Sequence, residues 1–183
     1  MNQNIYNYAS GAQWKDENFD VASYRDTGAS PPDIITIPTT NIITVSFDGA
    51  STVEDIDACK ELNHDYREGT PIYFHVHWYA TTSAAGNVKW QIEYYITKWD
   101  VVTPVKGTIS VVAAASGVAW QPQITSFGAL DLGALAEIGS QIHFRFFRDP
   151  TDVADTYGAD AAVGTVGYHY QTNSRGSAAI SAK

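Results

Sequence analysis

Apolar and polar residues alternate along the segment from Leu62 to Ile96, and this alternation is the clearest pattern in the chain. Between positions 72 and 79 every second residue is a large apolar one, and tyrosines and histidines stand between them. The same period of two returns between positions 88 and 95. Because successive side chains of a β-strand point to opposite faces, the pattern predicts two strands joined as a hairpin, each with one buried face.

Strand signals of this kind recur at short intervals from about Ile42 onward, separated by glycine-rich, proline-bearing or acidic segments that favour turns. The predicted strands span residues 42–47, 53–62, 71–80, 87–98, 107–115, 120–126, 141–148 and 163–171. Only Ala129–Glu137 is compatible with a helical turn, which the local glycines keep short. The sequence therefore predicts an all-β fold, a single jelly-roll-like antiparallel β-sandwich.

Residues 1–41 lack this periodicity and are interrupted by proline and glycine, which favours extended chain or loops. The segment nevertheless holds several aromatic residues, too many for a purely solvated tail: Tyr6, Tyr8, Trp14, Phe19 and Tyr24. We therefore predict an extended N-terminal arm over residues 1–41 and a sandwich domain over residues 42–183. The arm is expected to lie on its own sandwich or, as the favoured interpretation, over a neighbouring subunit.

Composition and charge restrict the possible partners. The chain has 183 residues, enough for one well-buried core, and a formal net charge of -9. An acidic chain without a basic cluster is a poor ligand for nucleic acid or an anionic membrane, so neither is predicted as a partner. The start of the sequence resembles no signal peptide, which predicts synthesis in a cytoplasm. The only cysteine, Cys59, excludes an internal disulfide and a CxxC motif.

Histidines alternate on one face of the predicted strand 71–80. His75 and His77 would place their side chains ~7 Å apart, so both could bind one zinc or nickel ion if another strand supplied a third donor. His143 and His169 are the candidate donors. Because an HxH pair is a weak motif, the alternative is that these imidazoles form hydrogen bonds on a packed outer face or at a subunit contact. We therefore predict no metal and no other cofactor.

Other candidate chemistry is weaker. Four aspartates in segment 149–160 could bind Ca²⁺ if they converged, but they do not match an EF-hand, and a solvated loop is the simpler interpretation. His64 and Asp65 would point to opposite faces of a strand and fit the turn at residues 67–70 better than acid–base catalysis. No nucleophile elbow, P-loop or dinucleotide motif is present, and a glycosidase with two distant carboxylates stays open. The sequence predicts no catalytic residue and no enzyme.

Aromatic residues are abundant, with five tryptophans and eleven tyrosines. Their large apolar surface and polar tip suit a protein interface or the face of a sugar ring. Trp78 and Trp90 are expected to pair in the core across the hairpin, whereas Trp99 and Trp120, near strand ends, are expected to be exposed. The predicted interface or binding residues are Trp14, Tyr73, His75, His77, Tyr79, Trp99 and Trp120.

Several motifs resemble the core of a family of bacteriophage and prophage proteins. They are HDYREGT at residues 64–70, HVHW at 75–78, GNVKW at 86–90, WKDE at 14–17, DTY at 155–157, YHY at 168–170 and GS at 176–177. The resemblance thus covers nearly the whole chain. It departs at Asn63 and Asn173, where the family has proline and aspartate, and both changes affect turns more than any candidate site.

The resemblance implies a virion component, such as a head-decoration, head-fibre or tail-associated protein, and no established catalysis. Together with the arm and the aromatic residues, it predicts a non-enzymatic virion structural protein that forms a homo-oligomer, expected to be a trimer, and contacts other virion proteins. The alternative is a carbohydrate- or receptor-binding module of a phage appendage, and a jelly-roll metalloenzyme comes third. A patch of exposed Trp and Tyr would favour the binding module, and aromatic residues buried between subunits would favour the structural role.

Overall fold

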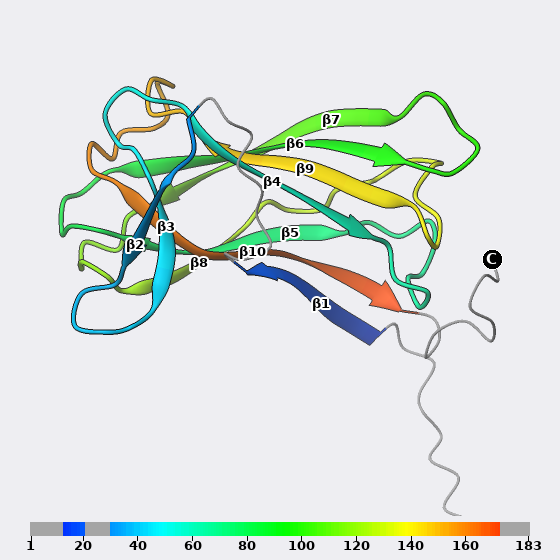
Figure 1. Ribbon diagram of the computed structural model, residues 1–183, viewed down its shortest axis with the longest axis horizontal. Coiled ribbons are helices and arrows are strands. Elements are labelled where there is room, and N and C mark those ends of the chain that lie inside the picture. The colour runs from blue at the N-terminus through cyan, green and yellow to red at the C-terminus, as the bar shows by residue number, and fades with distance from the viewer. Residues whose placement is uncertain (1–12, 21–29, 173–183) are drawn as a thin grey trace, which may run out of the picture.

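The computed structural model of the protein describes residues 13–20 and 30–172, and Figure 1 shows how the strands are arranged. These residues form ten β-strands and no helix, in two antiparallel sheets that lie face to face, which confirms the all-β sandwich. The strands are β1 Gln13–Asp20, β2 Asp33–Thr36, β3 Ile43–Phe47, β4 Glu54–Glu61, β5 Tyr73–Ala80, β6 Asn87–Thr97, β7 Val105–Ala114, β8 Pro122–Ser126, β9 Gln141–Arg148 and β10 Ala161–Thr172. The described residues include no helix long and apolar enough to cross a membrane.

The larger sheet has six strands in the order β2-β3-β10-β5-β8, and β1 also pairs with β10. β10 holds two partners on one edge because β3 pairs with residues 161–163 and β1 with residues 165–172. Its register against β5 shifts between Val163 and Thr165, as at a β-bulge. Beyond this shift, β1, β10 and β5 lie side by side (Figure 1).

The smaller sheet has four strands in the order β4-β9-β6-β7, and its inner face packs on the larger sheet. Aromatic rings fill the space between the two sheets. The Trp90 ring of β6 lies 5.5 Å from the Phe47 ring of β3, and 5.8 Å from the Trp78 ring of β5, between ring centroids. All three side chains are fully buried, so apolar burial between the sheets holds the sandwich together.

Each of the eight predicted strands has a counterpart among β3 to β10, with bounds that differ by two residues or fewer. The predicted helical turn at Ala129–Glu137 is wrong. Leu130 forms an isolated β-bridge with Ile72, its N–H donating to the Ile72 carbonyl at 2.8 Å, and Leu132 is buried. The two leucines are therefore anchored by the sandwich, and this tertiary contact outweighs the weak helical propensity of the segment.

The predicted hairpin between the strands that flank residues 81–86 is also wrong, because β5 belongs to the larger sheet and β6 to the smaller one. Trp78 and Trp90 do pack against each other, at 73° between ring planes, but they do so across the sandwich. A period of two fixes which face of a strand is buried and leaves open which strand lies beside it. Pairing within a hairpin and packing between sheets therefore give the same sequence pattern.

The predicted N-terminal arm contributes two strands to the larger sheet, β1 and β2. Residues 1–12 and 21–29, with the predicted anchors Tyr6, Tyr8 and Tyr24, lie outside the described residues. β1 packs Phe19, 2% exposed, against Phe144 of the opposite sheet, with ring centroids 4.7 Å apart. Lys15 of the same strand forms an ion pair with buried Asp65. The part of the arm that β1 spans thus lies on its own sandwich, while contact of the arm with a neighbouring subunit stays a prediction.

Candidate functional site

The outer face of the larger sheet carries the polar and aromatic side chains that alternate with the core. Cross-strand pairing places Asp16 opposite His169, His169 opposite Tyr73, and His75 opposite Ser126, so these residues share one face. From β1 to β8, the residues on the outer face include Trp14, Asp16, His169, Tyr73, His75, His77, Tyr79, Ile124 and Ser126. Five of the seven predicted binding residues, Trp14, Tyr73, His75, His77 and Tyr79, are therefore brought together on one surface.

One end of the outer face is hollowed. An open hollow of about 420 Å³ is lined by Trp14, Tyr73, Ser126 and His169, which come from four different strands. The rings of Trp14 and Tyr73 meet edge to face, with centroids 5.4 Å apart and planes at 73°. Trp14 is 50% exposed, so much of its ring is free to contact a ligand.

A cluster of titratable side chains adjoins this hollow. Asp16 Oδ1 lies 3.7 Å from His75 Nε2 and 3.6 Å from His169 Nδ1. The two imidazole rings stack, with centroids 4.4 Å apart and planes at 18°. Burial is the main cause that lowers the pKa of His75, and His169 and His77 lower it further, whereas Asp16 and the backbone of Tyr73 raise it. The His75 ring is therefore neutral at pH 7.

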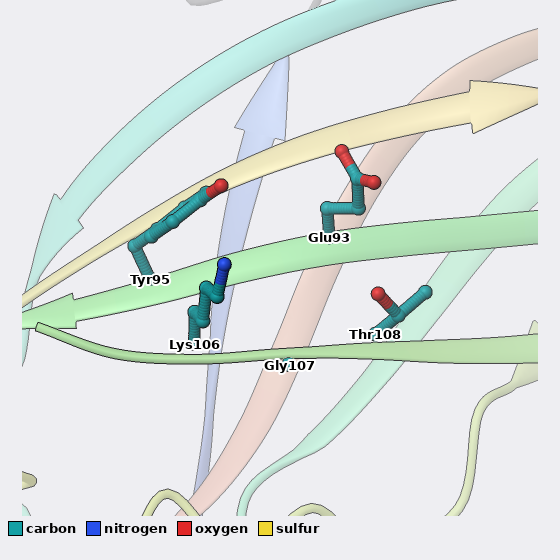
Figure 2. Close-up of a pocket in the computed structure, with 5 residues that line it drawn as sticks. All are labelled: Glu93, Tyr95, Lys106, Gly107 and Thr108. Carbon is teal, nitrogen blue, oxygen red and sulfur yellow. The ribbon is translucent and has the colours of Figure 1, made fainter.

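A second, smaller hollow lies on the four-stranded sheet. It measures about 210 Å³ and is lined by Glu93, Tyr95, Lys106, Gly107 and Thr108. In Figure 2, Glu93 and Tyr95 stand on β6, beside Lys106 and Thr108 of β7. Tyr95, 42% exposed, supplies the single aromatic ring among the lining residues, and Glu93 already accepts a hydrogen bond from Arg145 at 3.2 Å. This hollow therefore offers less aromatic surface than the one beside Trp14.

Three predicted site residues lie away from the outer face. His143 is on β9 of the opposite sheet, with its Nε2 3.7 Å from Cys59 Sγ, so it cannot join His75 in one metal site. Trp99 follows β6 and is 60% exposed, as predicted. Trp120 is only partly exposed, and its φ is 62° because the chain turns there to enter β8. Its backbone N–H donates to the Ala80 carbonyl at 2.8 Å.

The aspartates of segment 149–160 are engaged by protein donors. Their partners are Thr151 for Asp149, Lys89 for Asp152, Arg148 for Asp155 and Gly49 for Asp160. Across residues 13–20 and 30–172, the one group of three metal-binding side chains is instead Asp16, His75 and His169. The calcium alternative therefore finds no converging carboxylates in this loop.

The HDYREGT motif forms a turn, as predicted. The Thr70 N–H donates to the Arg67 carbonyl at 3.2 Å, and Gly69 has a φ of 76°, a conformation that favours glycine. Asp65 points inward, 4% exposed, and accepts a hydrogen bond from the Tyr170 hydroxyl at 3.0 Å. The motif thus forms a turn and places the Asp65 carboxylate inside the protein.

Sequence reasoning missed Asp16 and Ser126 as members of the site. Asp16 was assigned to an arm without regular structure, and Ser126 is a common residue near a strand end. One signal was present: Trp14 and Asp16 alternate with Lys15, Glu17 and Phe19, a period of two that the polar residues conceal. Polar alternation of this kind becomes informative only once the partner strand is known.

No protein family model and no curated protein matches the chain. Among solved structures, it is similar to the CBM22-2 xylan-binding domain from Paenibacillus barcinonensis Xyn10C, at 9% identity and a TM-score of 0.46, over 84% of this chain and 98% of that one. It is also similar to the mannan-recognising carbohydrate-binding module TmCBM27, at 10% identity and a TM-score of 0.42, over 88% of this chain and 100% of that one. The family 11 carbohydrate-binding module from Clostridium thermocellum is similar at 10% identity and a TM-score of 0.39, over 92% of this chain and 93% of that one. Similarity this distant assigns no ligand.

Proposed function

We propose that this protein is a non-enzymatic carbohydrate-binding module of a phage appendage, and that it binds a neutral sugar in the hollow beside Trp14. The phage location follows from the sequence resemblance alone. The sugar-binding role rests on one observation of the structure: Trp14 and Tyr73 set two rings at 73° around an open hollow, beside two hydrogen-bonding side chains.

The chemistry of the hollow suits a sugar ring. A pyranose has an apolar C–H face that packs on an aromatic ring, and hydroxyls at its rim that need hydrogen-bond partners. The Ser126 hydroxyl and the His169 imidazole lie at the edge of the hollow and can donate or accept such bonds. A net charge of -9 disfavours acidic sugars, so a neutral glycan is expected.

Removing either ring should weaken sugar binding. Trp14→Ala and Tyr73→Ala should each raise the dissociation constant for the sugar at least about tenfold, because aromatic rings that become buried on binding supply most of the binding energy at a small contact surface. The ligand would be selected on an array of neutral oligosaccharides, and its affinity measured by titration calorimetry. Tyr95→Ala is the matched control, since it removes a partly exposed ring from the opposite sheet and should leave the affinity unchanged.

Two results would contradict the proposal. One is an array on which no neutral glycan retains the protein. The other is a Tyr95→Ala variant that loses as much affinity as Trp14→Ala, because binding would then not depend on the hollow.

A second candidate function, the virion structural role, is favoured by the exposed end of the larger sheet. β2 is the edge strand there, and Ile34 of β2 and Ile43 of β3 are 75% and 59% exposed. An edge strand with exposed apolar side chains is a template for pairing with another chain. We propose that a second copy of this chain occupies this edge in the homo-oligomer; the trimeric state and contacts with other virion proteins stay predictions.

A charge on this edge should prevent self-association. Ile34→Lys should lower the mass measured by light scattering from that of an oligomer to that of a monomer, because edge lysines oppose strand pairing. Val153→Lys is the matched control, since Val153 is 94% exposed in the loop between β9 and β10. A wild-type protein that is monomeric, or an Ile34→Lys variant with unchanged mass, would remove the support for the structural role.

A further inference from the structure

Three neighbouring strands bring metal-binding side chains to one point of the outer face. Asp16 of β1 stands directly opposite His169 of β10, and His75 of β5 lies diagonally across from His169 on the same face. The donor atoms of the three residues all lie within 4.8 Å of one another. β1, β10 and β5 are side by side at this place (Figure 1). The cluster therefore depends on the fold and could not form within one segment of sequence.

A glycine opens the space that the cluster needs. Gly167 of β10 pairs with His75 in the strand register, and a Cβ atom on Gly167 would lie 2.5 Å from Asn18 Oδ1, 2.7 Å from the Glu17 carbonyl oxygen and 2.9 Å from His75 Cε1. The His75 ring therefore passes over the backbone of β10 toward Asp16. Any side chain at position 167 would therefore clash with β1 as well as with the His75 ring.

His75 is the member of the cluster that lacks a polar partner. It is 1% exposed, and neither of its ring nitrogens makes a hydrogen bond of ordinary length and angle, although the Tyr73 backbone lies near enough to raise its pKa. Buried polar atoms are nearly always satisfied, so an imidazole in this state points to a ligand. Asp16 Oδ1, at 3.7 Å from His75 Nε2, is too far away for a hydrogen bond.

The spacing of the donors suits a shared ion better than direct hydrogen bonds. Nitrogen and oxygen ligands at ~2.0–2.1 Å from a tetrahedral zinc ion lie ~3.3 Å from one another. The two distances from Asp16 Oδ1 to imidazole nitrogens are 3.6 and 3.7 Å. Because a metal ion lies in the plane of each imidazole that binds it, the partly exposed His169 ring has to turn out of its stack with His75 to complete the site. Two imidazoles and one carboxylate are donors for zinc, nickel or cobalt, whereas calcium and magnesium prefer oxygen ligands alone.

We propose that Asp16, His75 and His169 bind one divalent transition-metal ion of the zinc, nickel or cobalt class. The ion joins β1 to β5 across β10 and gives Nε2 of the buried His75 ring a partner. The remaining coordination positions face solvent, where water completes the shell. Because the ion binds the folded arrangement of three strands, it stabilises the docking of β1 on the sheet. The site shares His169 with the adjoining hollow, but the ion binds whether or not a sugar is present.

Titration calorimetry tests the site on the full chain, produced without a histidine tag and freed of metal by a chelator. ZnCl₂ and NiCl₂ should each bind with a stoichiometry of one ion per chain. Asp16→Asn and His169→Gln should each weaken binding at least about tenfold, since removal of a ligand costs no less than loss of an outer-shell partner. His143→Gln is the matched control, because it removes a histidine from the opposite sheet and should bind like the wild type.

Thermal unfolding gives a second readout. Added ZnCl₂ should raise the Tm of the wild type and of His143→Gln, and leave the Tm of Asp16→Asn unchanged. Asp16 is partly exposed and asparagine has nearly the same shape as aspartate, so Asp16→Asn should keep the fold. A substitution of the buried His75 could unfold the protein and is therefore a poorer test. The proposal is overturned if none of these ions binds the wild type, if Asp16→Asn and His169→Gln retain wild-type affinity, or if His143→Gln loses it.

Discussion

Replacing Arg148 with methionine should lower the free energy of unfolding by about 3–5 kcal/mol, because it leaves a carboxylate buried without its counter-charge. The side chains of Arg148 and Asp155 are 0% and 1% exposed, and they meet through two hydrogen bonds of 2.9 Å. The guanidinium also donates to the backbone carbonyls of Tyr157 and Ala159. One side chain thus ties the loop between β9 and β10 to the core.

Arg145→Met is the matched control for this prediction. Arg145 lies on the same strand, but its side chain is 33% exposed and pairs with Asp55 and Glu93 at the surface. Exposed ion pairs contribute about 0–1 kcal/mol to the free energy of unfolding, so Arg145→Met should lose little stability. Denaturant unfolding followed by circular dichroism measures both variants. Equal losses for Arg145→Met and Arg148→Met would contradict the assigned role of the buried pair.

A double variant separates charge from packing. In Arg148→Met with Asp155→Leu, neither buried charge remains, and part of the lost stability should return relative to Arg148→Met alone. No recovery would indicate that the guanidinium acts mainly through its hydrogen bonds to the loop carbonyls.

Trp90→Ala should lower the free energy of unfolding by about 3–5 kcal/mol, because it opens a cavity between the two sheets. Trp90 is fully buried, and its ring contacts Phe47, Trp78 and Phe146, with centroid distances of 5.5, 5.8 and 5.1 Å. The Trp90 side chain of β6 therefore contacts residues of three other strands, β3, β5 and β9. The same denaturant titration measures the loss.

Two further substitutions bracket this effect. Trp90→Phe keeps an aromatic ring in the core and removes an indole N–H that has no hydrogen-bond partner, so its loss should be much smaller than that of Trp90→Ala. Trp99→Ala removes a tryptophan that is 60% exposed and should cost below about 1 kcal/mol. A Trp90→Ala variant as stable as Trp99→Ala would show that the sheets are held together elsewhere.

The sequence predicted some residues of the candidate site and missed others. The alternation in residues 72–79 placed Tyr73, His75 and His77 opposite the core, and the strand register confirms that they share a face, although His75 is itself buried. Asp16 could not be found in the same way, since a short polar segment forms β1 only by pairing with β10. His169 was named as a donor, but its partner across the sheet follows from register, which periodicity leaves free.

The sequence by itself determined the all-β class, the positions of the eight strands from β3 to β10, and the buried face of β5 and β6, because side-chain alternation is a local property of a strand. Only the tertiary structure decided that β5 and β6 belong to different sheets, and that β1 closes onto β10. These choices depend on contacts between residues far apart in the chain. For the same reason, only the fold brings Asp16, His75 and His169 together over the bare backbone of Gly167.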